Sequence, residues 1–214
     1  MEKNIKLIAF DVNGTILDDF SAFSEALNSV FDYFKKPRMS AHELRNEFTQ
    51  PWTGIYRKRG ITENKTSEEF LYKLYNKAYQ VQPSAKPFAG LESSLKWIKD
   101  KNITTAIIST QQNIITDRLL KQYNLHRYFD FHLGGVADKT EVLQNLVKKL
   151  KIKPEQTMYV GDQDSDMRFA KDANCIAIAF TSGVHSKKKL QNAGAQYFIN
   201  NFTQLIELLQ NYER

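Results

Sequence analysis

The feature that most constrains this fold is the alternation of short apolar runs with amphipathic stretches along most of the chain. Several runs are apolar at nearly every position, as in strands of a parallel sheet that helices cover on both faces. Between these runs, apolar residues recur at helical spacing, for example at Leu91, Leu95 and Ile98. The pattern predicts an α/β fold with a doubly wound, Rossmann-like parallel sheet, whose ligands bind at the carboxyl ends of the strands. The expected strands are Lys6–Phe10, Thr104–Ile108, Phe131–Leu133, Thr157–Val160, Ile176–Phe180 and Tyr197–Ile199.

One segment interrupts this alternation between the first and second predicted strands. From Asp18 to Ser84 the chain carries helical stripes, such as the one from Phe20 to Phe34, but no convincing strand. Proline and glycine residues, including Pro37 and Gly60, punctuate the segment. We therefore expect residues 1–17 and 85–214 to form the Rossmann-like core, and residues 18–84 to form an inserted helical cap.

Composition narrows the class of protein. No stretch approaches the roughly 18 apolar residues that a membrane span needs, and the apolar run Leu7–Phe10 is too short for the core of a signal peptide. The single cysteine, Cys175, excludes an internal disulfide framework and opens an apolar run, so we interpret it as a packed thiol in a reducing compartment. We expect a cytoplasmic monomer or homodimer without membrane contact.

The net charge of +6 favours an acidic partner, but its distribution argues against nucleic acid. Lysines gather at 148–153 and at 187–189, with no interleaved aromatic residues and no arginine-rich face. A solvated basic surface that weakly attracts small anions is the simpler interpretation. The predicted cap also carries Arg57-Lys58-Arg59, which is either a solvated turn or a grip for a remote anionic group of a substrate.

Two predicted strand ends carry groups suited to anion chemistry. The first strand ends in Asp11-Val12-Asn13-Gly14-Thr15, where a carboxylate at a strand tip faces solvent beside the free N–H groups of a glycine turn. That arrangement suits attack on an electrophile whose anionic oxygens the turn holds, although Asn-Gly is also a common turn. The second strand ends at Ser109-Thr110, whose hydroxyls can donate to an anion or cap the helix that we expect from Gln111 onward.

Two further features place opposite charges near the same edge. Lys139 begins a predicted helix, where a cation opposes the helix dipole, so we expect an anion beside it. The fourth predicted strand ends in Gly161-Asp162-Gln163-Asp164-Ser165-Asp166. Three carboxylates within five residues repel one another unless a cation lies among them, and oxygen ligands suit Mg²⁺. Asp162 and Asp166 are the better ligands, whereas Asp164 can serve as a helix cap.

Taken in order, these four features resemble the motifs of the haloacid dehalogenase-like superfamily, and the resemblance covers essentially the whole chain. The stretch Lys86–Leu91 also looks like the family's return from a helical cap to the core. Among the members, the chain is similar to phosphoglycolate phosphatases and sugar-phosphate hydrolases with helical caps. The resemblance therefore implies Mg²⁺-dependent hydrolysis of a small phosphorylated metabolite.

The same resemblance assigns roles to individual residues. Asp11 is implied to be the nucleophile that becomes an aspartyl-phosphate, while Ser109 and Lys139 hold the phosphoryl oxygens. Gly14, Thr15 and Thr110 are implied to line the phosphate site. The implied metal ligands are Asp11, the backbone carbonyl of Asn13, Asp162 and, through water, Asp166.

Asn13 departs from the family pattern, because phosphatases of this family usually carry Asp at this position. That Asp protonates the leaving group and then activates water, and loss of a general acid–base typically costs about 10²–10⁴ in rate. Asn13 is therefore an introduced substitution, a natural residue with slow turnover, or the sign of a different reaction. The alternatives are a non-catalytic protein that binds or senses a phosphometabolite, and a phosphonate hydrolase. The latter needs a Schiff-base lysine in the cap, for which Lys58, Lys65 and Lys73 are available.

Overall fold

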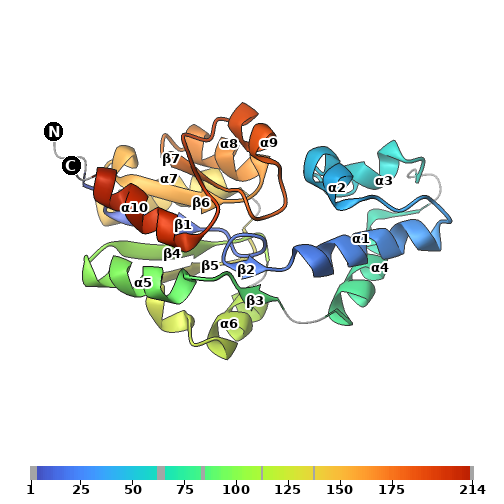
Figure 1. Cartoon of the computed structure of the whole chain (residues 1–214), viewed down its shortest axis with the longest axis horizontal. Helices are drawn as coiled ribbons and strands as arrows, with labels where there is room; N and C mark the ends of the chain where they lie inside the picture. The colour runs from blue at the N-terminus through green and yellow to red at the C-terminus, as the bar shows by residue number, and fades with distance from the viewer. Residues whose placement is uncertain (1–3, 62–65, 83–84, 112, 137, 213–214) are drawn as a thin grey trace.

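The structure, a computed structural model, describes residues 4–61, 66–82, 85–111, 113–136 and 138–212. Its centre is a six-stranded parallel sheet with strand order β5-β4-β1-β6-β7-β8 (Figure 1). All six predicted strands are present, with bounds within one residue of those expected. They are β1 (Leu7–Phe10), β4 (Thr104–Ile108), β5 (Phe131–Leu133), β6 (Thr157–Gly161), β7 (Ile176–Phe180) and β8 (Tyr197–Ile199). The predicted doubly wound α/β fold is confirmed.

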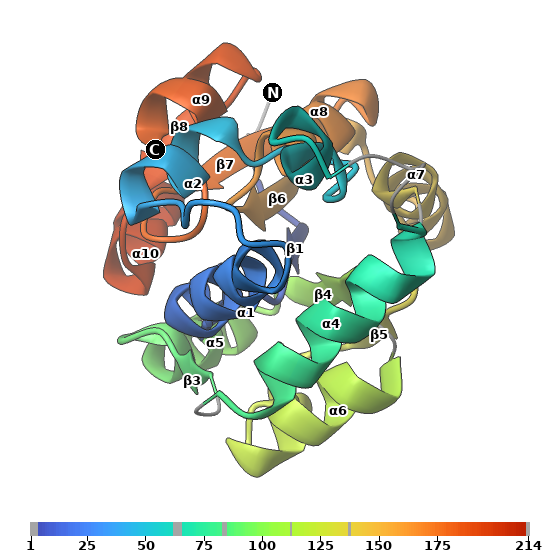
Figure 2. The same cartoon turned by 90° about the vertical axis from the view of Figure 1, so that its right-hand side faces the viewer.

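The strands are largely apolar because helices cover both faces of the sheet. Along β1, Ile8 and Phe10 pack into one apolar cluster, while Leu7 and Ala9 pack into a second on the opposite face. Helices α5 (Leu91–Asp100), α6 (Asn113–Gln122) and α10 (Phe202–Tyr212) contribute to the first cluster. Helices α7 (Lys139–Leu150), α8 (Asp164–Asp172) and α9 (Lys187–Asn192) contribute to the second, and Figure 2 shows the two layers on either side of the sheet.

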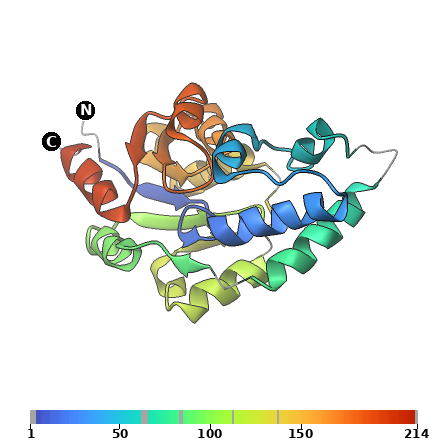
Figure 3. The same ribbon diagram turned by 45° about the vertical axis from the view of Figure 1, so that its right-hand side comes forward.

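The segment between β1 and α5 is helical, as its apolar stripes predict. It contains α1 (Phe20–Tyr33), α2 (Ala41–Glu47), α3 (Gly54–Lys58) and α4 (Glu68–Gln80). Helices α1 and α4 run side by side beyond the sheet (Figure 3). A third apolar cluster, with Leu27, Phe31, Tyr56 and Leu71 at its centre, holds these helices together.

A short two-stranded sheet at the base of this helical segment has no counterpart in the sequence pattern. The strands β2 (Leu17–Asp18) and β3 (Lys86–Pro87) pair antiparallel and bring the two ends of the segment together. The exact domain bounds given above stay a prediction, and Ser84, the last residue of the predicted cap, lies outside the described residues.

Two predictions from composition can be compared with the structure. Cys175 is buried in the second apolar cluster, and burial raises the pKa of its thiol to about 11, so it is a core thiol with little nucleophilic character. In the part of the chain that the structure describes, none of the helices combines the length and apolarity that a membrane crossing demands.

Candidate active site

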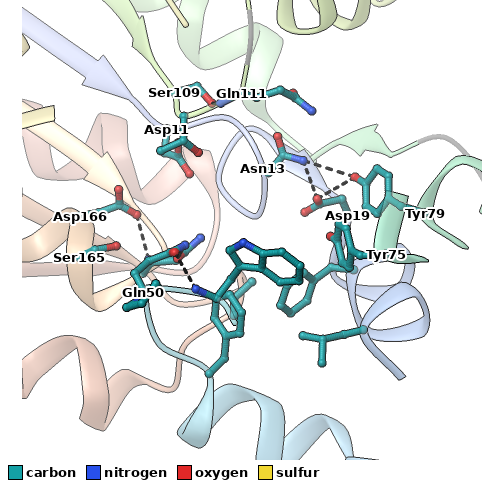
Figure 4. A pocket seen from close by; sticks show the side chains of 18 of the residues that line it. Asp11, Asn13, Asp19, Gln50, Tyr75, Tyr79, Ser109, Gln111, Ser165 and Asp166 are labelled. Atoms are coloured by element: carbon teal, nitrogen blue, oxygen red, sulfur yellow. Dashed lines mark hydrogen bonds between the residues drawn. The ribbon is translucent and has the colours of Figure 1, made fainter. Parts of the chain in front are cut away.

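The ends of three neighbouring strands form the floor of the site. Asp11 follows β1, Ser109 follows β4 and Asp162 follows β6. Strand β1 lies between β4 and β6, and adjacent strands are about 4.8 Å apart. The chain also reverses its winding direction at β1, which is where doubly wound sheets open a crevice. A cavity of about 720 Å³ lies there, lined on the sheet side by Asp11, Asn13, Ser109, Lys139 and Asp166 (Figure 4).

Lys139 is the central cation of this floor. It begins α7 and is only 4% exposed, and its Nζ lies 2.9 Å from Asp11 Oδ1 and 2.8 Å from Asp166 Oδ1. The ammonium also donates to the hydroxyl of Tyr159 at 2.9 Å. Although burial alone lowers the pKa of a lysine, attraction to Asp11 and Asp166 raises the pKa of Lys139 well above its usual value. The anion expected beside Lys139 is therefore present, as two carboxylates.

Asp11, Asp162 and Asp166 form an acidic cluster that fits a divalent cation. One carboxylate oxygen from each residue lies within 4.8 Å of the others. Burial and the neighbouring carboxylates raise the pKa of Asp162 well above its usual value; burial, opposed by Lys139, raises the pKa of Asp11 to about 6. Because one lysine does not balance three buried acids, the site favours a further positive charge. Carboxylate oxygens are the ligands that Mg²⁺ prefers.

The turn after β1 is shaped around Asp162. That carboxylate is fully buried, and it accepts hydrogen bonds from the Val184 N–H at 2.7 Å and from the Thr15 hydroxyl at 3.2 Å. Gly14 has a φ of 75°, and a Cβ there would collide with the Asp162 carboxylate. The Thr15 hydroxyl therefore holds the Asp162 carboxylate, Gly14 leaves room for it, and neither residue is among those that line the cavity.

The substrate contacts implied for Gly14 and Thr15 stay a prediction, since neither residue is among those that line the cavity. Both lie against Asp162, where the glycine gives the carboxylate room and the threonine hydroxyl fixes its orientation. Thr110, in contrast, is exposed and lines the cavity beside Ser109.

Two further expectations need correction. Asp11 is only 5% exposed, so its carboxylate faces the cavity and Lys139 rather than the open protein surface. Asp164 does not cap α8, because the helix begins at Asp164 itself and the N-cap residue is Gln163. The Asp166 carboxylate accepts the Gln163 N–H at 3.0 Å and so closes the first turn. Asp164 instead pairs with Arg168 at 2.9 Å.

The position of Ser109 is compatible with both roles considered for it, capping and anion binding. Its hydroxyl oxygen accepts the N–H of Gln111 at 3.2 Å, as a capping residue does, although α6 begins only at Asn113. The same side chain lines the cavity close to Asp11 (Figure 4). The hydroxyl proton is therefore left to donate to a bound anion.

Asn13 belongs to a polar cluster that the sequence did not reveal. Its amide nitrogen donates to Asp19 Oδ2 at 2.7 Å and lies 3.4 Å from the Tyr79 hydroxyl, which itself donates to Asp19 Oδ2 at 2.9 Å. Because a carboxylate only accepts, Asp19 fixes the amide with its oxygen turned away from this cluster (Figure 4). That oxygen is buried and accepts no hydrogen bond from the described residues. Burial raises the pKa of Asp19 despite these bonds.

The wall opposite the acidic floor comes from the helical segment and is largely aromatic. It includes Trp52, which precedes α3, and Tyr75 and Tyr79 on α4 (Figure 4). The lysines considered for a Schiff base are absent from this wall in the described part of the chain: Lys58 and Lys73 are exposed and do not line the cavity, and Lys65 lies outside the described residues.

Comparisons with known proteins agree with this geometry. A family model described as haloacid dehalogenase-like hydrolase matches residues 8–180. "Phosphoglycolate phosphatase 1" of Pseudomonas aeruginosa is 25% identical over 94% of this chain and 78% of its own length. A phosphoglycolate phosphatase of Chromobacterium violaceum is 23% identical over 98% of each chain. The solved structure of a haloacid dehalogenase-like hydrolase from Streptococcus pneumoniae superposes with a TM-score of 0.81 and 20% identity, covering 98% of this chain and 100% of its own.

Proposed function

This chain belongs to the haloacid dehalogenase-like hydrolase family, and on that basis we propose that it hydrolyses a small phosphomonoester by way of an aspartyl-phosphate on Asp11, with Mg²⁺ as cofactor. The observation that carries the proposal is the meeting of Asp11, Lys139, Asp162 and Asp166 at the carboxyl edge of the sheet. The names of the curated relatives support a phosphorylated small molecule as the substrate.

The first step is a displacement at phosphorus. A carboxylate oxygen of Asp11 attacks the phosphorus atom, a P–O bond forms on Asp11, and the bond to the leaving oxygen breaks. Asp11 must be ionised to attack, and the ammonium of Lys139, 2.9 Å away, favours the ionised form. Lys139 and the Ser109 hydroxyl are the donors that would hold the phosphoryl oxygens.

The proposed metal ligands are Asp11, Asp162, Asp166 and the backbone carbonyl of Asn13. When bound, Mg²⁺ supplies positive charge that offsets the charges of the phosphate and of the acidic cluster. The Thr15 hydroxyl and the Val184 N–H hold Asp162 in place for this role.

Asn13 makes both proton transfers difficult. An amide neither protonates the leaving alcohol oxygen nor takes a proton from the water that attacks the aspartyl-phosphate. The amide nitrogen also donates to Asp19, so only the carbonyl oxygen of the Asn13 side chain is available to other groups, and a carbonyl oxygen has no proton to give. We therefore expect turnover about 10²–10⁴ slower than with an acid at this position, and accumulation of the phosphorylated enzyme.

Phosphate release with Mg²⁺, measured over a broad panel of phosphomonoesters, tests the proposal. We expect slow release by the chain as it stands, faster release by Asn13→Asp, and none by Asp11→Asn. The absence of release in both the unchanged chain and Asn13→Asp, with folding verified by circular dichroism, would refute the proposal.

The Asn13–Asp19 hydrogen bond favours one alternative, a protein that binds a phosphometabolite without hydrolysing it. This alternative predicts saturable binding of a phosphate ester by calorimetry, no product, and no gain from Asn13→Asp. The phosphonate hydrolase is less well supported, because no lysine of the described helical segment lines the cavity.

A further inference from the structure

The side of the cavity that faces the leaving group is mostly aromatic, although the amides of Gln50 and Asn76 also line it. Trp52, Tyr72, Tyr75 and Tyr79 line it from the α3–α4 side, and Phe23 and Phe48 line it from the α1–α2 side. These residues lie opposite Asp11 and Lys139, so they would surround whatever group is attached to a phosphate held on the floor (Figure 4).

We propose that the leaving group of the substrate carries a neutral aromatic ring, which packs against Trp52 and Tyr75. This inference rests on the proposed function, because it concerns the part of the same phosphomonoester that leaves as the alcohol. It adds the chemical class of that alcohol, which the family does not fix.

The rings form a preorganised surface. The centroids of Trp52 and Tyr75 are 5.6 Å apart with planes inclined by 50°, and those of Tyr75 and Tyr79 are 5.7 Å apart and nearly parallel at 23°. Tyr56 supports Trp52 from behind with an edge-to-face contact at 5.7 Å. These distances fall within the range of favourable aromatic pairs, so a substrate ring joins an existing array with little rearrangement.

Charge argues against an anionic leaving group. In the described part of the helical segment, the only charged side chain that lines the cavity is Asp19, which repels an anion. The cationic cluster Arg57-Lys58-Arg59 does not line the cavity. Arg57 instead pairs with Glu68 at 3.1 Å, and Arg59 pairs with Glu47 at 3.1 Å. A distal carboxylate, such as that of phosphoglycolate, would therefore meet ring faces, Asp19 and neutral amides in this described segment, without a cation to balance its charge.

The cavity is large enough for this assignment. Its volume of about 720 Å³ lies within the range of pockets that enclose a small ligand of several rings. A phosphate with a two-carbon tail would leave most of the aromatic wall in contact with water. A ring-bearing substrate covers that wall and gains the apolar contact that it offers.

Non-hydrolysable phosphonates test this inference without relying on turnover. Benzylphosphonate, n-butylphosphonate and phosphonoacetate would be titrated calorimetrically into the unchanged chain with saturating Mg²⁺. We expect benzylphosphonate to bind about tenfold more tightly than n-butylphosphonate, and phosphonoacetate to bind most weakly. Quenching of Trp52 fluorescence, absent in Trp52→Phe, would locate the bound ring.

Variants separate a contact with the ring from a general loss of structure. Tyr75→Leu should reduce the benzyl-to-butyl preference to about one, whereas Tyr75→Phe, which keeps the ring, should preserve it. Tyr33→Leu is the matched control, since Tyr33 is an exposed residue of α1 that does not line the cavity, and it should leave the preference unchanged.

The outcomes distinguish this inference from the proposed function. If all three phosphonates bind and the ring gives no advantage, or if phosphonoacetate binds best, the inference is wrong and the phosphate site stands. If none of the three binds, the phosphate site itself is refuted, and the inference falls with it.

Discussion

Replacing Lys139 with methionine removes the cation that lies between the two buried acids Asp11 and Asp166. Asp11 and Asp166 offer carboxylate oxygens no more than 4.8 Å apart, so their mutual repulsion is about 3–4 kcal/mol at an effective dielectric constant of about 20. Breaking a buried ion pair by removal of one partner typically costs about 3–5 kcal/mol. We expect Lys139→Met to lose about this much unfolding free energy at pH 7.5 without Mg²⁺. Protonation of one acid should reduce the loss at pH 5.

Urea denaturation at both pH values, with and without Mg²⁺, measures this effect. Because a divalent cation in the acidic cluster replaces the missing charge, Mg²⁺ should stabilise Lys139→Met more than it stabilises the unchanged chain. Lys148→Met is the matched control, since Lys148 lies exposed on the same helix and its loss should change stability by no more than about 0.5 kcal/mol. Equal stability of the two variants at pH 7.5 would show that Lys139 does not hold these carboxylates together.

Three further predictions concern the acids and their neighbours. The pKa of Asp11 rises from 3.8 to about 6 on folding, so its contribution to stability is present below about pH 4 and is lost as the pH rises through 6. Asp19 and Asp162 have raised pKa values as well, so urea denaturation without Mg²⁺ should show a steeper decline in the unchanged chain than in Asp11→Asn. In Asn13→Asp, the new carboxyl faces Asp19, whose negative charge raises the pKa of that carboxyl. The pH optimum of phosphate release should therefore fall by about 1–3 units when Asp19→Asn is added, and an unchanged optimum would contradict this contact. Thr15→Val removes a hydrogen bond to Asp162 and should weaken Mg²⁺ binding about tenfold in calorimetry, whereas unaltered affinity would exclude this positioning role.

The sheet could be predicted because its strands are buried on both faces. Runs such as Ile176–Phe180 are apolar at every position, and few other structures bury a short segment so completely. The strands β2 and β3 could not be predicted, since two residues each are too short to show a period of two.

The candidate site was only partly predictable for a related reason. Asp11, Ser109 and Asp162 lie together because each follows one of three strands that are neighbours in the sheet. The carboxyl ends of neighbouring parallel strands lie at the same edge. The contact of Asn13 with Asp19 and Tyr79 depends instead on how α4 packs along α1, which brings Asp19 beside a residue 60 positions later in the chain. Sequence spacing carries no signal for such a contact. The orientation of the Thr15 hydroxyl toward Asp162 likewise follows from the geometry of the turn and not from residue type.

Trapping of the phosphorylated enzyme tests the central claim most directly. The chain would be incubated with Mg²⁺ and a phosphomonoester that it binds, quenched in acid, and examined by intact-mass and peptide mass spectrometry. The account predicts a single added phosphoryl group on Asp11, which persists longer than in Asn13→Asp and is absent in Asp11→Asn. No phosphoryl group on the unchanged chain, or one that Asp11→Asn retains, would contradict it.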